Sequence, residues 1–306
     1  MTGSVLHPRA FKITVGWTLL LLYLGSVVHA TESSLACPDW PTCFGTMVPE
    51  MTGGVFWEHL HRLVAGGLLL MFGLATWLAR KETGDRPWMF RACLGGVALL
   101  LVQSVFGGLT VLYRLPDLVS TTHLALALLF LALATVLASS TSDDGAWNDW
   151  PDQERRSLAK WATGAAVLVF AQSVLGALVR HMDAGMACPD APLCLGQVVP
   201  PLVNAPIISH FFHRVIALIA LAVVSGVALH AIRTEAPLRA RRWALTAAVL
   251  AWVQVGLGVA SVLTVLAVLP VSLHTVVAAG LLSVLVHLAT RAAGSRTAAT
   301  VAADVA

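Results

Sequence analysis

Eight runs of mostly apolar residues divide the chain, and each is long enough to cross the hydrocarbon core of a membrane. They cover residues 12–29, 59–79, 92–111, 119–139, 158–179, 210–231, 243–265 and 271–290. A helix needs about 20 such residues to span a core ~30 Å thick. Only 11% of the residues are charged, whereas a soluble domain carries roughly 25%. Because the gaps leave no room for a soluble domain, the sequence predicts an all-α integral membrane protein with eight transmembrane helices.

The basic residues predict the orientation of these helices. With both termini in the cytoplasm, fifteen of the 19 lysines and arginines fall on the inner side. The outer side holds the other four, which are Arg62, Arg114, Arg180 and Arg214. This distribution satisfies the positive-inside rule, and it accounts for the net charge of +3 without any binding of nucleic acid. We therefore expect a multi-pass protein in the plasma membrane of a prokaryote.

An internal repeat organises the chain. The stretch "LACPDWPTCFG" at residues 35–45 returns as "MACPDAPLCLG" at residues 186–196. The segments "EHLHRLVAG", "QSVFGGLTVL" and "TTHLALA" return as "HFFHRVIAL", "QVGLGVASVL" and "SLHTVVA", at the same offset of 151 or 152 residues. Residues 12–30 resemble a secretory signal peptide, but the repeat pairs this run with the fifth one, so we expect it to be retained.

The repeat predicts two four-helix bundles in parallel orientation. Residues 1–138 would form the first and residues 158–306 the second, joined by a polar cytoplasmic linker at residues 139–157. Parallel repeats related by a pseudo-twofold axis along the membrane normal are a known membrane architecture. Small residues such as Gly107 and Gly258 are interpreted as positions where helices pack closely.

Four of the 11 histidines occupy matched positions, His61 with His213 and His123 with His274. His61 and His213 lie near the outer end of the second helix of their half, and His123 and His274 lie near the outer end of the fourth. Each half therefore holds one pair, His61 with His123 or His213 with His274. Ionisable side chains inside a membrane are costly and usually functional, and two imidazoles on facing helices are a common way to hold haem iron. A single histidine is more often bonded to a carbonyl or to headgroups, but four at matched positions favour haem. Zinc is disfavoured because no further ligands recur with them.

One acidic residue breaks the symmetry of the two halves. Glu58 precedes His61 by three residues and shares its helix face, whereas His210 stands at that position before His213. The carboxylate predicts a reactive site in the first half and a structural or electron-relay haem in the second. The alternative is an interfacial glutamate that only caps its helix.

The ordered motifs "ACPDWPTC", "EHLHR", "TTHLA", "ACPDAPLC", "FFHR" and "SLHT" resemble the haem A synthase family over residues 12–290. The resemblance implies an oxidoreductase that converts the C8 methyl group of farnesylated haem O to a formyl group through hydroxylated intermediates, giving haem A. It further implies that His61 and His123 flank the substrate haem and that His213 and His274 hold a haem b cofactor. Glu58 matches the essential acidic position of the family.

The resemblance also implies partners and contacts. Haem O synthase, which is a farnesyltransferase, and other cytochrome oxidase assembly proteins would act with the chain in the lipid bilayer. An oligomer is possible. Arg62 and Arg214 directly follow proposed ligands, and arginine suits carboxylates, so they are candidates for haem propionate contacts. Anchoring to headgroups explains them equally well.

The two cysteine loops are predicted to lie on the outer side, where disulfides persist. We expect Cys37 to pair with Cys43 and Cys188 with Cys194, while Cys93 is a buried free thiol. A structural role is favoured for both pairs, and a redox role for the first pair is the alternative.

Two other functions compete with the enzyme. A bis-haem electron-transfer protein explains four histidines equally well but leaves Glu58 without a reason. A transporter would need broken helices or a polar membrane midplane, and the predicted helices carry few midplane polar residues, so this function ranks third.

Overall fold

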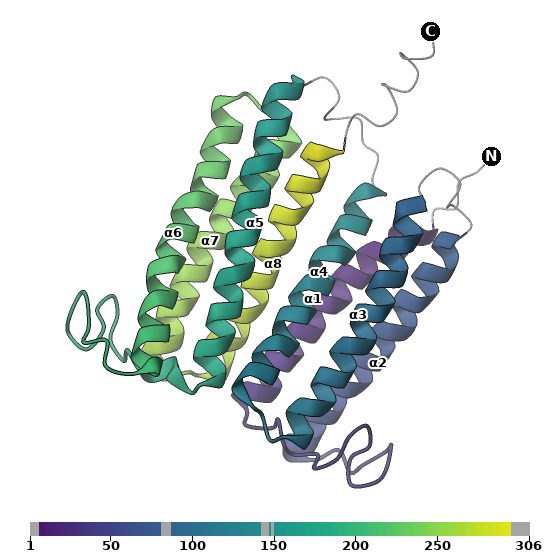
Figure 1. The fold of residues 1–306 in the computed structure, drawn as a ribbon, viewed down its shortest axis with the longest axis vertical. Helices are drawn as coiled ribbons and strands as arrows, with labels where there is room; N and C mark the ends of the chain where they lie inside the picture. The colour runs from purple at the N-terminus through teal and green to yellow at the C-terminus, as the bar shows by residue number, and fades with distance from the viewer. Residues whose placement is uncertain (1–5, 81–86, 142–146, 148–149, 295–306) are drawn as a thin grey trace.

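The computed structural model describes residues 6–80, 87–141, 147 and 150–294. Within these residues the chain is all-helical, and eight helices are long and apolar enough to cross a membrane (Figure 1), as predicted. They are α1 (Leu6–Ala30), α2 (Gly53–Ala79), α3 (Pro87–Leu112), α4 (Asp117–Ser140), α5 (Asp152–His181), α6 (Ala205–Arg233), α7 (Leu238–Leu263) and α8 (Val268–Ala293).

Most helices extend beyond the apolar runs that predicted them. The helix α5 begins at Asp152, inside the predicted linker, because acidic residues in a first turn favour a helix N-terminus. Asp152 also accepts a hydrogen bond of 2.7 Å from Arg155. The predicted seventh span was two residues too long, since α7 ends at Leu263 and Val265 has a left-handed φ of 51°. Two pieces of the predicted linker, residues 142–146 and 148–149, lie outside the described residues.

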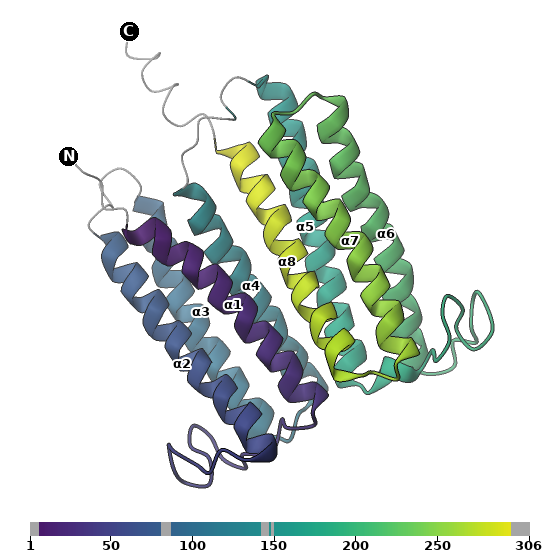
Figure 2. The ribbon, with the colours of Figure 1, turned by 180° about the vertical axis from the view of Figure 1, so that it is seen from behind.

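The helices pack as two groups of four (Figures 1 and 2). In each group successive helices are in contact and the first also contacts the last, so α1 packs on α4 and α5 on α8. Between the groups α1 and α4 pack against α8, and α4 also packs against α5. The two cysteine loops lie at one end of the molecule, and the start of α1 and the end of α8 lie at the other (Figure 1). The pseudo-twofold axis and the cytoplasmic position of the termini stay predictions.

Hydrogen bonds between side chains join the two groups. The Ser26 and Thr275 hydroxyl oxygens lie 3.0 Å apart across α1 and α8. The hydroxyl oxygens of Thr135 and Ser283 lie 2.9 Å apart across α4 and α8. One turn further along, Ser139 Oγ lies 2.9 Å from His287 Nδ1. Polar contacts of this kind join helices in a membrane, where burial of apolar surface adds little.

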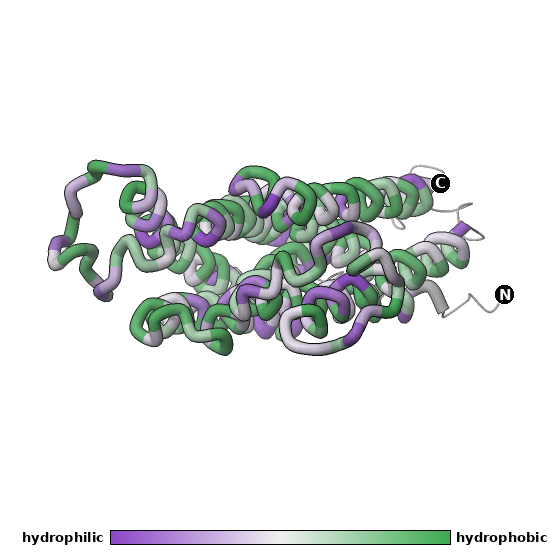
Figure 3. The backbone as a smooth tube through the Cα atoms, turned by 90° about the horizontal axis from the view of Figure 1, so that it is seen from below, coloured by the Kyte–Doolittle hydropathy of each residue, from purple (hydrophilic) through white to green (hydrophobic). Residues whose placement is uncertain are grey.

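Apolar side chains cover the outside of the helix groups, as lipid contact requires. Seen from the loop end, the helices are mainly hydrophobic and hydrophilic residues recur in the loops (Figure 3). Large apolar side chains that face outward include Leu70, Leu74, Leu101, Val167, Val249 and Trp252.

The two cysteine loops have the same internal structure. Disulfides join Cys37 to Cys43 and Cys188 to Cys194, as expected, and Cys93 is free and buried. In the first loop the Asp39 carboxylate accepts hydrogen bonds from the Thr42 hydroxyl and from the Gly45 and Phe44 amides. Those bonds, with Thr42 the largest cause, hold the pKa of Asp39 below its ordinary value.

Asp190 has the same position in the second loop. Its carboxylate accepts the amides of Leu195 and Gly196, each at 2.7 Å. The Gly196 amide is the main reason that the pKa of Asp190 lies below its ordinary value. Gly45 and Gly196 both have a φ of +73°, a conformation that favours glycine.

Candidate functional site

The four matched histidines lie at the loop end of the helix groups. His61 and His213 come about two turns after the first residues of α2 and α6, and His123 and His274 come about two turns into α4 and α8. His61 and His123 line one cavity. His213 and His274 lie close enough to interact electrostatically. The structure therefore brings together the members of each predicted pair.

Each of the four imidazole rings packs against a glycine on the preceding helix of its half. A Cβ atom added at Gly176 would lie 2.7 Å from Cε1 of His213, and one added at Gly107 would lie 3.0 Å from Cε1 of His123. An added Cβ at Gly25 would lie 3.1 Å from Nε2 of His61, and one at Gly258 would lie 3.1 Å from Cε1 of His274. A Cβ would therefore crowd each ring, most of all His213, so these glycines help to set where the rings stand.

Backbone carbonyls orient two of the rings. His123 Nδ1 donates a hydrogen bond of 3.1 Å to the carbonyl of Gln103, and His274 Nδ1 donates one of 3.1 Å to the carbonyl of Gln254. These bonds assign the proton to Nδ1 and make Nε2 the acceptor atom, the one a metal would bind. Here Nε2 of His123 faces the Gln103 amide nitrogen at 3.4 Å, and Nε2 of His274 faces the Gln254 amide nitrogen at 3.2 Å. In the second half the Gln172 amide nitrogen lies 2.9 Å from His213 Nδ1.

The same glutamines carry buried oxygen atoms without a partner. The Oε1 atoms of Gln103, Gln172 and Gln254 form no hydrogen bond within the described part of the chain. Unsatisfied polar atoms in an apolar interior are costly, and they commonly mark the place of an absent ligand or water. All three lie on side chains whose amide nitrogens face the histidines.

The cavity that holds His61 and His123 encloses about 1520 Å³ of empty space, including its mouth. It lies mainly among α1, α2, α3 and α4, and Trp40 of the first cysteine loop closes part of it against α3. Most of the exposed area of the lining is apolar, although many polar side chains, Glu58 and Arg62 among them, also line it. This composition is typical of a site for a large, mainly apolar ligand.

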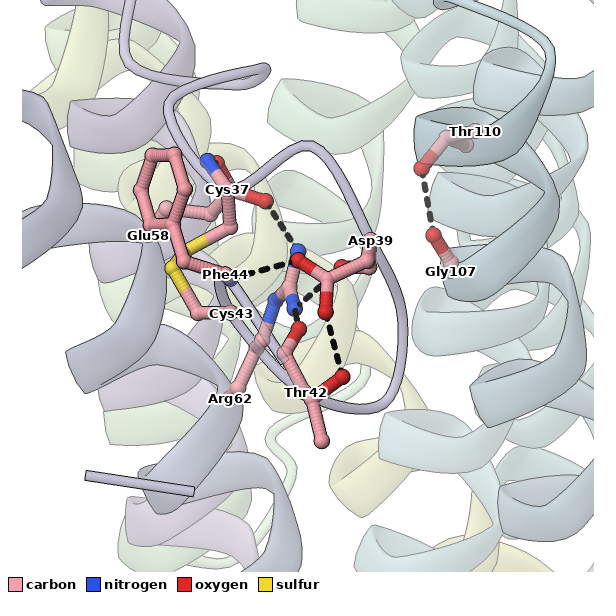
Figure 4. A network of polar contacts seen from close by, with 9 residues as sticks. All are labelled: Cys37, Asp39, Thr42, Cys43, Phe44, Glu58, Arg62, Gly107 and Thr110. Carbon is pink, nitrogen blue, oxygen red and sulfur yellow. Dashed lines mark hydrogen bonds and ion pairs between the residues drawn. A yellow bond between two sulfur atoms is a disulfide. The ribbon is translucent and has the colours of Figure 1, made fainter. Parts of the chain in front are cut away.

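Glu58 is buried and lines the same cavity as His61. Figure 4 shows it among its neighbours in the first cysteine loop, near Cys37 and Arg62. Its Oε1 accepts a hydrogen bond of 2.5 Å from Arg62 Nη2, and its Oε2 accepts one of 2.8 Å from the Cys37 amide. Arg62 Nη1 donates in turn to the carbonyls of Asp39 and Thr42, at 2.8 and 2.6 Å. The carboxylate therefore connects the cavity to the disulfide loop, and Arg62 balances its charge.

The second half keeps the arginine of this arrangement but has no carboxylate there. Arg214 donates to the carbonyls of Asp190, Leu193 and Cys188, at 2.7, 2.6 and 2.6 Å. His210, at the place of Glu58, has its Nδ1 2.9 Å from the carbonyl of Ala184. Both predicted propionate contacts, Arg62 and Arg214, thus bind loop carbonyls here, and their role toward propionates stays a prediction.

Sequence reasoning interpreted Gly107 and Gly258 only as helix-packing positions, and it assigned neither these glycines nor the glutamines to the histidine sites. The glycines and glutamines recur at the repeat offset, Gly25 with Gly176, Gly107 with Gly258 and Gln103 with Gln254. That recurrence was the signal that could have identified them. Gln172 has no such signal, since Leu21 stands at its place in the first half.

These features define a class of protein: multi-pass membrane proteins with two repeated helix groups, each carrying a matched histidine pair at one end. A sequence profile of the family described as "Cytochrome oxidase assembly protein" matches residues 50–286. A haem A synthase of Symbiobacterium thermophilum is 32% identical over 280 residues, which cover 88% of this chain and 90% of the relative. A haem A synthase of Halalkalibacterium halodurans is 29% identical over 269 residues, or 84% of this chain and 88% of the relative.

The chain belongs to the cytochrome oxidase assembly protein family, and its similarity to haem A synthases spans both halves. The bacterial relatives and the eight apolar helices together make it a multi-pass prokaryotic membrane protein. The comparisons favour the enzyme over the electron-transfer protein considered from the sequence.

Proposed function

We propose that the chain is a haem A synthase, an oxidoreductase that converts the C8 methyl group of haem O to a formyl group. The observation that carries the proposal is that one apolar cavity collects Glu58, His61 and His123. The names of the bacterial relatives support the same activity. The matched site of the second half has His210 in place of the carboxylate, which supports unlike roles for the two halves.

The histidines have assigned roles in this proposal. His61 and His123 hold the iron of the substrate, haem O, and His213 and His274 hold a resident haem b. The residues of the second site fit this group: His213 and His274 would hold it, Gly176 and Gly258 leave room for their rings, and the Gln254 carbonyl orients His274. A bound haem b would supply electron transfer.

The reaction adds one oxygen atom to the methyl carbon. With water as its source, four protons and four electrons must leave for a formyl group to form, and the electrons would pass by way of the haem b of the second half to an external electron acceptor. Two strong histidine ligands leave no open position on the substrate iron, so removal of electrons from the methyl group followed by attack of water is favoured. Glu58 would stabilise the developing cation or accept a proton, and its hydrogen bonds from Arg62 and the Cys37 amide fix its carboxylate in place.

The surroundings of the site fit a lipid-soluble substrate. A farnesylated haem would enter sideways from the bilayer, with its tail along the apolar helices. We place the cysteine loops and all four histidines toward the outer face of a prokaryotic plasma membrane. Haem O synthase and proteins of cytochrome oxidase assembly are the proposed partners, because they make the substrate and use the product.

The experiment is expression of the full chain together with a haem O source, followed by extraction of the pigments. Wild type should accumulate haem A, whereas Glu58→Gln and His61→Ala should lose most of it. Glu50→Gln is the control. Glu50 is an exposed carboxylate in the segment between α1 and α2, and it does not line the cavity.

Two outcomes would contradict the proposal. Full conversion by Glu58→Gln would remove the carboxylate from the mechanism. Two stoichiometric haem b groups in the wild type without any conversion of haem O would favour the electron-transfer protein instead.

A further inference from the structure

The second half of the chain contributes part of the wall of the first-half cavity. Ala177, Arg180 and His181 of α5 line it, as does Thr275 of α8. His29 of α1 lines the same part of the wall, and its ring centroid lies 5.1 Å from that of His181. Three nitrogen-bearing side chains, His29, Arg180 and His181, therefore meet where the two halves join.

The Arg180 guanidinium lies in this wall without a partner. It makes no hydrogen bond or ion pair to any residue that the structure describes, although it is partly buried in the cavity wall. An arginine inside a membrane protein ordinarily pairs with an anion or a carbonyl, because an isolated charge in a low-dielectric interior is costly. A cation that faces a cavity and lacks such a partner indicates that the ligand supplies the anion.

The acidic groups nearby do not fill that role. Glu58 is the one carboxylate in the cavity lining among the described residues, and Arg62 is bonded to it. Asp183, three residues beyond Arg180, acts on it electrostatically. However, Asp183 is exposed and forms no ion pair within the residues described.

Arg180 lies closer to the loop end of the molecule than the proposed histidine ligands do. It lies one turn beyond Gly176 on α5, toward the loop end, and His29 lies one turn beyond Gly25 on α1. Gly25 and Gly176 pack against His61 and His213. The cation is thus nearer the loop end of the molecule than the proposed level of the iron.

We propose that Arg180, flanked by His29 and His181, binds a carboxylate of the molecule in the first-half cavity. This inference rests on the proposed function, in which that molecule is haem O, a dicarboxylate. Arginine suits the task because its planar guanidinium forms paired hydrogen bonds with a carboxylate. The sequence repeat offers no equivalent in the first half, since His29 stands at the place of Arg180.

Such a contact would select which methyl group meets Glu58. Two axial ligands fix the plane of a haem but leave it free to rotate about the line between them. The carboxylates occupy one edge of the ring, so a single fixed cation at the loop end removes this freedom. Arg180 is then a specificity-determining residue, in addition to contributing affinity.

The test compares haem O with its dimethyl ester, which lacks both negative charges. Each is titrated by absorption into the purified full chain that carries its resident haem. Wild type should bind haem O more tightly than the ester. Arg180→Gln should bind haem O about tenfold more weakly or worse, and it should bind haem O and the ester with equal affinity. The affinity of Arg180→Lys for haem O should lie between those of wild type and Arg180→Gln.

The control is Arg114→Gln, because Arg114 is an exposed arginine at the same end of the molecule. It should bind like wild type. Haem b content, measured on the same samples by pyridine haemochrome, should be unchanged in Arg180→Gln.

Three results would overturn the inference: equal binding of acid and ester by wild type, retained preference for the acid in Arg180→Gln, or loss of haem b instead of haem O affinity. If Arg180→Gln fails to fold, the affinities of wild type and of Arg180→Lys for haem O and for its ester still test the inference. Binding is read without turnover, so a chain that discriminates acid from ester but makes no haem A would refute the proposed function alone.

Discussion

At the scale of single residues, the histidine sites depend on neighbouring glycines, whose lack of a side chain leaves space for the imidazole rings. Each proposed ligand ring packs against a glycine, and the contact distances leave no room for a methyl group at the tightest of them. A glycine in a helix interior ordinarily weakens the helix by about 1 kcal/mol relative to alanine. Its use at four matched positions therefore indicates that close approach of the imidazole outweighs helix propensity.

Gly176→Ala should displace His213, because the new Cβ would lie 2.7 Å from Cε1 of the ring. We expect reduced haem content of the purified protein and a loss of about 1–3 kcal/mol of stability from overpacking. Absorption difference spectra and thermal unfolding in detergent measure the two effects.

The matched control is Gly164→Ala, on the same helix, where an added Cβ meets no atom within 4 Å. Its haem content should equal that of wild type. Equal haem content in Gly176→Ala would show that the ring has room to move and that the glycine contact does not set its position.

At the scale of helices, the contact between α4 and α8 holds the two groups together through polar side chains. Thr135 and Ser139 on α4 meet Ser283 and His287 on α8. Hydrophobic attraction contributes little between helices in lipid, so such bonds and close packing carry the association.

Thr135→Val removes one of these bonds while keeping the shape of the side chain. We expect the protein to lose about 0.6–1.7 kcal/mol, the range found for hydrogen bonds between membrane helices. The measurement is the unfolding free energy in mixed micelles.

Thr290→Val is the control, since the Thr290 hydroxyl donates to the Val286 carbonyl of its own helix and to no other group in the described residues. The Thr135 hydroxyl makes the equivalent bond to the Leu131 carbonyl in addition to its contact with Ser283. A smaller loss for Thr135→Val than for Thr290→Val would mean that the bond to Ser283 adds no stability.

The helices themselves were predictable and their ends were not. Apolar length identified all eight, because a bilayer imposes the same minimum on each. It missed the start of α5 at Asp152 and the end of α7 at Leu263, which depend on terminal charge and backbone conformation.

The candidate site was predictable to the extent that the repeat revealed it. His61, His123 and Glu58 were proposed from spacing, and the structure places all three in one cavity. Arg180 was not proposed, because its function depends on how the halves meet, and a single sequence carries no direct record of contacts between distant helices.

At the scale of the whole molecule, the orientation in the membrane is open to a direct test. Alkaline phosphatase, active only in an oxidising compartment, should be active when fused after Tyr113 at the loop end and inactive at the C-terminus. A fluorescent protein should give the reverse pattern. Activity at the C-terminus would invert the predicted topology and place the disulfide loops in the reducing cytoplasm.

The shared wall of the first-half cavity has a thermodynamic consequence. Because α5 contributes Arg180 to this cavity and Gly176 to the contact with His213, one rigid element serves both sites. A ligand that shifts α5 when it binds in one half changes the affinity of the other half for its own ligand by some factor. Reciprocity then requires the second ligand to change the affinity of the first by the same factor. Loading of the two halves is in this sense one coupled equilibrium, whichever half is filled first.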